Sequence, residues 1–527
     1  MGRRLLIVLS LANLMFLRMW RELLNGKLAY YSKVPPNGLL GGLMLNILLV
    51  AALFWIAAEL AERSRSPVLR GVVRWIFFVV VLLTASCNKL AVIFHARMGT
   101  LGLVLFALVA LAALAIFAFW RDRVAHGLAV LLLIASPFVL VTFAQGAWLL
   151  YQVNFKMNFT ALPVKNGSSE AHPRPRVVWL IFDELDQKQA FIARDPSVQM
   201  PEFDRLRAES LYAENAYPPA RATELSLPAL LTGKLVSKAT PLGSDELILQ
   251  FGEDKTPHRW SRERNIFSAT HSLGMNAALT GWFHPYCRIE GIALPLTDCH
   301  WQDGGILLGE IRRDASIPTS MLDELLDIPT VTWELRHVPG FLSAGERERA
   351  EELHDYQELA PLGIQNAADP TLGLVVLHMP VPHPHGIYDR KTGQFSTAES
   401  HGYLDNLALA DRTLGEVRAA MEKRGVWKDS VVIASADHWW RSEFWSTHFG
   451  WAPDDDRALA PLDHRIPFLV RFPQAAGKSY APQFNTVLTH DLVLAILNGE
   501  VKDAAGAAAW LDAHKTIGDS PYSVYRK

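Results

Sequence analysis

A strong charge of either sign is missing from this chain of 527 residues, whose formal net charge at pH 7 is −2. Proteins that bind the phosphate backbone of nucleic acids usually carry a marked excess of lysine and arginine. The near-zero balance therefore gives no basis for proposing nucleic acid as a partner. Internal repeats and low-complexity tracts are also missing, and a chain of this length is expected to form two or more structural units.

Cysteine is scarce as well, since the chain contains three. Cys87 lies in an apolar run, whereas Cys287 and Cys299 lie twelve residues apart in a stretch that has the composition of a loop. The pair closes a small disulfide loop if this part of the chain faces an oxidising compartment, and otherwise the two are unrelated thiols. Of these alternatives we expect the disulfide.

Long apolar runs, in contrast, fill the first 150 residues. A helix crosses a bilayer with about 20 mostly apolar residues, and five segments approach this length. They run from about 5 to 20, 38 to 60, 75 to 94, 101 to 120 and 128 to 151. The first is followed by bulky residues (MWRELL) rather than by a small-residue cleavage site, so we interpret it as an uncleaved anchor. The sequence predicts a five-helix transmembrane anchor over residues 1–151.

Lysine and arginine in the short connecting loops indicate the orientation of such an anchor, because cytoplasmic loops carry an excess of them. With the N-terminus inside, the inner segments contain Arg3, Arg4, Arg63, Arg65, Arg70, Arg121 and Arg123. The outer loops then contain Arg21, Lys27, Lys33 and Arg97. This bias predicts an integral protein of the plasma or inner membrane, with the residues after Tyr151 on the extracytoplasmic side.

The rest of the chain has the pattern of an α/β domain. Residues 152–176 are polar and rich in glycine, serine and proline, which is typical of a linker. Short apolar runs, each expected to be a buried strand, lie at 177–182, 374–377 and 431–434. Helical patterns alternate with them, for example at 344–359 and 406–423. This alternation predicts a doubly wound, mostly parallel sheet within residues 177–475, followed by a closing helix and a polar tail over 476–527.

Several polar side chains lie at the ends of these predicted strands. The chemistry of doubly wound sheets is found at the carboxyl ends of the strands, which places Asp183, His378 and Asp437 at one edge. Together with the neighbouring His438, the two carboxylates suit a divalent-metal site. The alternative is that each acid caps the helix that follows it, which is common.

A second signal is a predicted helix that begins near Thr223 and ends at Gly233. Thr223 is either an ordinary N-cap residue or a nucleophile. The second alternative follows from the free N–H groups and the positive dipole end that a helix N-terminus presents to an anion. A threonine hydroxyl at that place, also bound to a metal, loses its proton more easily and attacks phosphorus.

Histidines are grouped in the loops of this domain. A single histidine is more often structural than catalytic, but several clusters in the loops of one domain suit metal ligation and contacts to phosphate oxygens. The grouped histidines are His378, His383, His385, His438, His448 and His464.

The order of these motifs resembles the alkaline phosphatase/sulfatase superfamily. A strand that ends in an acid is followed by Thr-x-x-Ser-x-Pro-x-Leu-Leu-Thr-Gly, then His-x4-His-Pro, then Ser-x-Asp-His. An anchor of five helices before such a domain resembles the lipid-A phosphoethanolamine transferases and the lipoteichoic acid synthases. The resemblance implies a sulfatase-like fold, a divalent cation (zinc or manganese) and membrane lipids or envelope glycans as partners.

Carried over position by position, the resemblance also implies roles for individual residues. The implied metal ligands are Asp183, Thr223, Asp437 and His438. Thr223 takes the nucleophile's place, where sulfatases have the cysteine that becomes formylglycine. His383 matches the histidine that meets the substrate phosphate or a second metal. We choose His448 as the last such histidine, with His464 as its rival.

The sequence also departs from these families. No Cys-x-Pro-x-Arg occurs, so the formylglycine route of true sulfatases is excluded. The stretch WWRSEFW follows His438, where the transferases are rich in glycine and glutamate, and this leaves the substrate open. The tryptophans of this region either line a lipid- or sugar-facing cleft or belong to the core; they are Trp439, Trp440, Trp445 and Trp451.

These features predict a membrane-anchored, metal-dependent enzyme that transfers a phosphoryl-linked group, of the phosphoethanolamine or glycerol-phosphate type, through Thr223. One alternative is a sulfatase-like hydrolase, acting as a phosphatase, phosphodiesterase or sulfuric ester hydrolase with water as the acceptor, because acceptor choice depends on pocket shape. A third possibility is a catalytically inactive envelope protein that binds a glycan or a lipid. The sequence does not reveal the oligomeric state.

Overall fold

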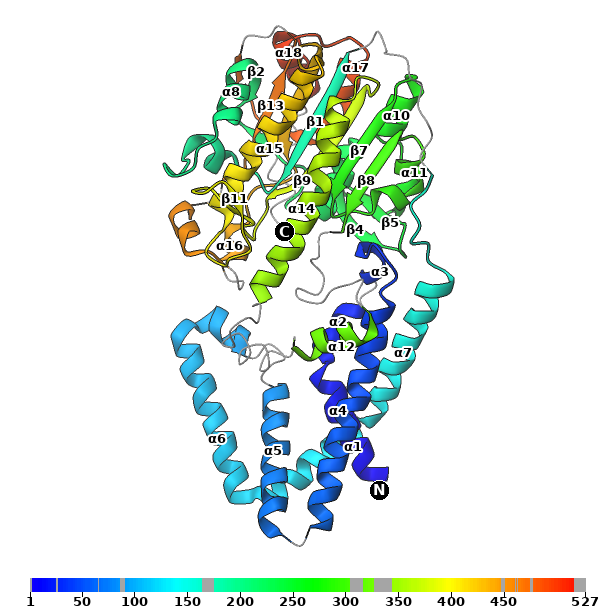
Figure 1. The fold of residues 1–527 in the computed structure, drawn as a ribbon, viewed down its shortest axis with the longest axis vertical. Coiled ribbons are helices and arrows are strands. Elements are labelled where there is room, and N and C mark those ends of the chain that lie inside the picture. Colours follow the sequence, from blue (N-terminus) through cyan, green and yellow to red (C-terminus); the bar gives the residue numbers. More distant parts are fainter. Residues whose placement is uncertain are drawn as a thin grey trace. The chain divides into compact units, whose positions relative to one another are not determined.

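The computed structural model forms two compact units (Figure 1). It describes residues 2–24, 27–64, 66–85, 91–163, 175–303, 316–326, 344–446, 451–459, 461, 463–473 and 477–515. The first unit, here called the helical unit, comprises Met1–Met157 and Ile306–Ser343. The second, the α/β unit, comprises Asn158–Gly305 and Ala344–Lys527. The helical unit therefore includes a segment that interrupts the α/β unit in the sequence.

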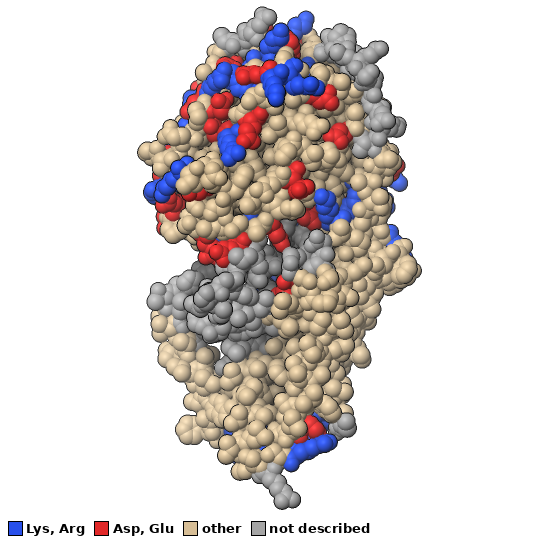
Figure 2. Space-filling view, in the orientation of Figure 1, with Lys and Arg blue, Asp and Glu red and all other residues tan. Residues whose placement is uncertain are grey.

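The described part of the helical unit consists of helices. They are α1 (Gly2–Met15), α2 (Leu17–Leu23), α3 (Leu28–Tyr31), α4 (Asn37–Arg63), α5 (Pro67–Ala85), α6 (Ala91–Ile134), α7 (Ser136–Phe155) and α12 (Ile317–Leu326). α12 packs against α4, where Asn46 donates a hydrogen bond to the buried Glu324 carboxylate at 2.8 Å. On the face shown in Figure 2, charged side chains are spread over the α/β unit, whereas the described surface of the helical unit is largely free of them except near one end.

Two stretches of the helical unit are long and apolar enough to cross a membrane, Asn37–Arg63 and Ala107–Phe155. For the described residues the predicted number of five spans is therefore wrong. The first predicted segment, 5–20, is divided between α1 and α2, and the third, 75–94, runs partly outside the described residues.

The fourth and fifth predicted segments also differ from the structure. The charged residues Arg121, Asp122 and Arg123 fit a helix interior, so α6 continues through them to Ile134. The break comes instead before α7, which has Pro137 in its first turn, because proline lacks the N–H that a continuous helix requires. The two predicted segments are thus parts of one long apolar stretch.

The α/β unit is built around a mixed sheet of eight strands, most of them parallel, in the order β14-β2-β13-β12-β1-β9-β7-β8. These strands are β1 (Arg176–Asp183), β2 (Ser210–Ala213), β7 (Ala277–Trp282), β8 (Asp298–Gln302), β9 (Leu374–Pro382), β12 (Ser430–Ala436), β13 (Phe468–Arg471) and β14 (Lys478–Tyr480). Only β13 runs antiparallel to its neighbours. Every residue of β1, β7, β9 and β12 is buried, as expected for parallel strands that are covered on both faces.

Helices and small sheets complete this unit. The helices are α8 (Pro201–Glu209), α9 (Thr223–Thr232), α10 (Ile266–Ser272), α11 (Glu290–Ala293), α14 (Ala344–Ala368), α15 (Tyr403–Lys423), α16 (Ser442–Trp445), α17 (Thr489–Leu497) and α18 (Ala504–His514). The short strands are β3 (Ala216–Tyr217), β4 (Val236–Pro241), β5 (Leu247–Phe251), β6 (His258–Arg259), β10 (Tyr388–Asp389), β11 (Gln394–Phe395) and β15 (Phe484–Asn485). α14 and α15 pack together against β9 (Figure 1), and α17 contacts β1, α9 and α10. The predicted α/β class with a mostly parallel sheet is confirmed.

The register of the central strands decides where their ends lie. Phe182 of β1 pairs with Met379 of β9 on one side and with Ala436 of β12 on the other. The residues that follow Phe182 and Ala436 are Asp183 and Asp437, so both acids emerge at the same edge of the sheet. Because of this register, the acids at the ends of two separate strands lie in one cluster.

Cys287 and Cys299 form a disulfide bond with a Cα–Cα distance of 5.7 Å, which confirms the expected pairing. Cys299 lies in β8, and Cys287 lies in the short helix Tyr286–Arg288 that follows β7. The bond therefore fixes the connection between two neighbouring parallel strands at one side of the sheet.

We expect the double variant Cys287→Ser/Cys299→Ser to lose about 3 kcal/mol of unfolding free energy, because closing a loop of this size restricts the unfolded chain by roughly that amount. Denaturant unfolding followed by circular dichroism measures the change. The native protein with its thiols blocked after reduction is the matched control and should show the same loss. A loss below about 1 kcal/mol would contradict the expectation.

Candidate active site

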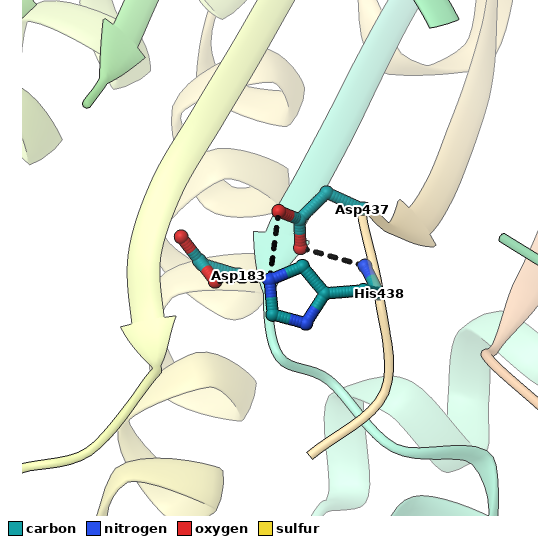
Figure 3. A group of neighbouring side chains, drawn as sticks. All are labelled: Asp183, Asp437 and His438. Atoms are coloured by element: carbon teal, nitrogen blue, oxygen red, sulfur yellow. Dashed lines mark hydrogen bonds and ion pairs between the residues drawn. The ribbon is translucent and has the colours of Figure 1, made fainter. Parts of the chain in front are cut away.

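Side chains from three separate elements meet at the edge formed by β1 and β12. The Thr223 hydroxyl, on the first residue of α9, lies 3.2 Å from Asp183 Oδ2 and 3.2 Å from His438 Nε2. His438 Nε2 in turn lies 3.6 Å from Asp183 Oδ1 and 3.4 Å from Asp437 Oδ2. Figure 3 shows the Asp437 carboxylate facing the His438 ring, with Asp183 beside them at the end of β1. The structure thus brings together all four residues to which the resemblance gives metal-binding roles.

This cluster has the composition and the spacing of a cation site. One ligand atom from each of Asp183, Asp437 and His438 lies within 4.8 Å of the others, and all three side chains are fully buried. Asp183 Oδ1 and Asp437 Oδ2 have no hydrogen-bond partner among the described residues. Two buried carboxylates side by side are costly unless a positive charge compensates them. A divalent cation would supply that charge, so these residues fit the group that the resemblance implies.

The protonation of the cluster is shifted by its burial. Burial, together with the nearby charge of Asp437, raises the pKa of Asp183 well above its ordinary value. Burial also raises the pKa of Asp437 to about 7 and lowers that of His438 well below its ordinary value. Without a cation, these shifts favour the protonated form of the carboxyl groups and the neutral form of the imidazole. Neutral imidazole is the form that binds metals, and cation binding displaces the carboxyl protons.

Hydrogen bonds around the cluster fix the direction of its ligand atoms. His438 Nδ1 donates to the carbonyl of Trp439 at 3.0 Å, so the lone pair of Nε2 faces the two acids. Asp437 Oδ1 accepts from the backbone N–H groups of His438 and Glu184, at 2.8 and 3.2 Å, and Oδ2 is left for a ligand. Such outer contacts set the tautomer and the orientation of metal ligands.

The position of Thr223 does not match the N-cap alternative. Ala222 is the N-cap residue of α9, and Thr223 is the first residue inside the helix. The Thr223 hydroxyl therefore contacts Asp183 and His438 rather than capping the backbone. The helix ends at Gly233, whose φ of 70° is the left-handed conformation that favours glycine. The first turn of α9 thus presents this hydroxyl together with the positive end of the helix dipole.

Two further histidines lie beside the cluster; the sequence placed His378 at this edge of the sheet and gave no signal for His284. His378 Nε2 lies 3.6 Å from Asp183 Oδ2, and its Nδ1 donates to the Trp282 carbonyl. His284, just after β7, donates from Nε2 to the carbonyl of Thr223 at 3.3 Å. Burial lowers the pKa of His378 to about 4 and that of His284 to about 3, so both rings are neutral. His378 was placed at the correct edge by its strand, whereas His284 follows a strand that the apolar runs do not reveal.

For the other predicted histidines the outcome differs from one residue to the next. His383 is buried between the rings of Trp282 and Trp445, each centred 5.0 Å away, and lies near Asp183. His448 lies outside the described residues. His464 packs against the Trp439 ring at 4.4 Å and is not among the groups of close ligand atoms in the described part of the chain.

An ion pair beside the cluster was not predicted. Glu184 follows Asp183 directly, is fully buried and has a φ of 62°. Its carboxylate accepts from Arg441 Nε at 2.6 Å and from Trp445 Nε1 at 2.9 Å. Burial raises the pKa of Glu184, and the charge of Arg441 opposes that effect.

The tryptophans near the site belong mostly to the core. Trp439, Trp440 and Trp445 are buried, which does not support a cleft lined by these three rings. Trp440 stacks between Tyr403, at 4.1 Å, and Trp451, at 5.7 Å. The Tyr403 hydroxyl donates to the Glu184 carbonyl at 2.8 Å, so this stack holds the segment that follows β1.

No protein-family model and no curated protein matches the chain. Solved structures do. A sulfatase from Pseudoalteromonas sp. has 15% identity and a TM-score of 0.43, over 61% of this chain and 67% of the sulfatase. A phosphonate monoester hydrolase from Agrobacterium radiobacter has 14% identity and a TM-score of 0.37, over 62% and 74%. An alkaline phosphatase superfamily protein from Vibrio parahaemolyticus has 13% identity and a TM-score of 0.34, over 65% and 71%.

The chain is similar to proteins of the alkaline phosphatase/sulfatase superfamily. Identity and TM-score are low in all three, so the chemistry of this chain is inferred below from its own residues.

Proposed function

We propose that this chain is a membrane-anchored, metal-dependent enzyme that transfers a phosphoryl-linked group, of the phosphoethanolamine or glycerol-phosphate type, through Thr223. One observation carries the proposal. The Thr223 hydroxyl lies 3.2 Å from both an acid and an imidazole of a buried cluster that suits a cation. A hydroxyl needs such neighbours to become a nucleophile at neutral pH.

In the proposed reaction, Asp183, Thr223, Asp437 and His438 would hold the divalent cation, zinc or manganese, whose charge would lower the pKa of the Thr223 hydroxyl. The Thr223 hydroxyl passes its proton to the Asp183 carboxylate, to which it donates a hydrogen bond. The Thr223 oxygen then forms a bond to phosphorus while the bond from phosphorus to the leaving alcohol breaks. The α9 N-terminus stabilises the charge on the non-bridging oxygens. An acceptor alcohol, or water in a hydrolase, then gives its proton to the histidine that served the leaving alcohol and attacks phosphorus. The bond from phosphorus to Thr223 breaks, and the Thr223 oxygen takes its proton back.

The leaving oxygen takes a proton from His383 or His448. Burial lowers the pKa of His383 well below its ordinary value, so its ring is neutral in the free protein. An anionic substrate beside the ring favours the protonated form. His383 is thus prepared to take up a proton as the substrate binds and to give it to the departing alcohol.

The proposed location follows from the apolar stretches and the disulfide. Asn37–Arg63 and Ala107–Phe155 are long enough to anchor the chain in the plasma or inner membrane. The bond between Cys287 and Cys299 favours an extracytoplasmic α/β unit, because disulfides persist in oxidising compartments. Such an anchor keeps the site close to membrane lipids or envelope glycans, which are the proposed partners.

Mass spectrometry of the metal-loaded protein after incubation with membrane lipids tests this function. We expect a mass adduct on the peptide that contains Thr223, and its mass identifies the transferred group. The Thr223→Ala variant should carry no adduct. Release of free phosphate without an added acceptor would assign the hydrolase instead of the transferase. An adduct on another residue, or a metal-loaded protein with neither adduct nor turnover, would contradict the proposal.

A further inference from the structure

The residues around the Thr223 hydroxyl are almost completely shielded from solvent. Asp183, Asp437 and His438 are fully buried, and Thr223 is 6% exposed. The side chain of Arg441, which follows the Asp437–His438 pair in the sequence, is 27% exposed. Of these groups, Arg441 therefore extends furthest toward the solvent from which a phosphoryl group arrives.

Arg441 is held in place by the residue next to a predicted metal ligand. Its Nε and Nη2 atoms lie 2.6 and 2.5 Å from Glu184 Oε1, and its backbone N–H donates to Glu184 Oε2 at 3.3 Å. A guanidinium has five N–H donors, and Glu184 takes one from Nε and one from Nη2. Nη1 has no hydrogen-bond partner among the described residues, so donors remain for an oxyanion.

The guanidinium of Arg441 lies beside the cluster through its contact with Glu184, the residue that directly follows Asp183. Glu184 accepts from Arg441 Nε at 2.6 Å, and ligand atoms of Asp183, Glu184 and His383 lie within 4.8 Å of one another. A cation in that position attracts the anionic phosphoryl group toward Thr223.

Arg441 also binds the Glu184 carboxylate, which a second cation would need as a ligand. Ligand atoms of Asp183, Glu184 and His383 lie within 4.8 Å of one another, which is the spacing of a second cation site. Both Glu184 oxygens are already engaged, by Arg441 and by Trp445 Nε1 at 3.1 and 2.9 Å. The positive charge at this side of the cluster is thus a guanidinium in place of a metal.

We propose that Arg441 binds the non-bridging oxygens of the transferred phosphoryl group, so that the site works with one divalent cation and one guanidinium. This inference rests on the proposed function. Arginine suits the role because its planar fork pairs with two phosphate oxygens at once. Glu184 and Trp445 position that fork.

Calorimetry measures the binding of inorganic phosphate to the metal-loaded protein. This measurement distinguishes phosphate binding by Arg441 from a role in which Arg441 only neutralises Glu184. The variants are Glu184→Gln, the double variant Glu184→Gln/Arg441→Met, and Arg471→Met as a matched control. Arg471 is an arginine that also forms an ion pair. In the sheet it lies opposite Val432, near the start of β12 and away from the strand end that carries the site. Metal content and the unfolding midpoint are recorded for each variant, to check that it is folded and metal-loaded. The double variant removes both partners of the ion pair, so it leaves no unpaired buried charge.

We expect the double variant to keep its metal and to bind phosphate about 10- to 100-fold more weakly than Glu184→Gln, as the loss of charge-assisted hydrogen bonds implies. Arg471→Met should bind phosphate as the native protein does. Phosphate affinity in the double variant within threefold of that in Glu184→Gln would overturn the inference, and so would a native protein that binds no phosphate. Failure of the proposed function is a separate result. In that case the protein still binds phosphate through Arg441 but carries no adduct on Thr223.

Discussion

Replacing Thr223 with alanine is expected to lower turnover by about 10³- to 10⁵-fold, the largest loss for any single substitution in this chain. The attacking oxygen itself is removed, and nucleophile substitutions in enzymes that form covalent intermediates have effects of this order or greater. Asp183, Asp437 and His438 remain to hold a cation, so the metal content should fall much less than the activity. Steady-state kinetics together with elemental analysis of the purified variant measure both quantities.

Thr223→Ser is the matched control, because it keeps a hydroxyl on the first residue of α9 and removes one methyl group. We expect it to retain much of the activity and to form the covalent adduct. The order native, serine, alanine should hold at saturating metal. If the alanine variant keeps more than about a tenth of the native turnover, Thr223 is not the nucleophile, and the contacts at 3.2 Å have another meaning.

The strands that carry this site can be predicted from the sequence because they are buried on both faces. β1, β9 and β12 are short runs of mostly branched aliphatic residues, a composition that differs clearly from that of their surroundings. Once they are placed side by side in a parallel sheet, the acids that follow β1 and β12 must lie at one edge. Thr223 can be found for a similar reason, since an apolar helical run begins beside it and stops at Gly233.

The remaining parts of the site depend on contacts that no local pattern encodes. β7 has the sequence AALTGW, whose alanines, threonine and glycine hide a buried strand, so His284 at its end has no visible context. Glu184 and Arg441 lie 257 residues apart in the sequence. Glu184 also has a left-handed backbone, which is unusual for a residue other than glycine. Only the folded chain shows this ion pair.

The apolar helices show a different limit of sequence-based prediction. Apolar composition locates the regions that suit a bilayer, but helix ends are set by residues that break hydrogen bonding. A short charged stretch such as 121–123 divides two apolar runs without ending α6. The number of spans predicted from the sequence therefore exceeds the two apolar stretches of sufficient length among the described residues.

Removing the divalent cation is expected to abolish activity and to make the folded state depend strongly on pH. Dialysis against a chelator should lower turnover to the level of Thr223→Ala, and added zinc or manganese should restore it. In the cation-free protein the pKa of Asp437, raised by burial to about 7, lies above its value in the unfolded chain. The folded state then binds protons that the unfolded state does not, so the free energy of unfolding falls as pH rises from about 4 to 7.

The affinity for the cation should instead rise with pH, because the metal and the protons compete for the same carboxylates. Below pH 7 each displaced proton costs about tenfold in affinity per pH unit, so affinity at pH 5.5 should be at least about tenfold lower than at pH 7.5. Asp437→Asn should bind little metal at either pH.

Asp411→Asn is the matched control for this measurement. Burial raises the pKa of Asp411 to about 7 as well, but this acid accepts a hydrogen bond from the Phe203 N–H, outside the cluster. Its substitution should leave metal affinity and the pH dependence of that affinity unchanged. Equal metal binding by Asp437→Asn and the native protein would show that the buried carboxylates do not hold the cation, and the unpaired oxygens of Asp183 and Asp437 would then have no explanation in catalysis.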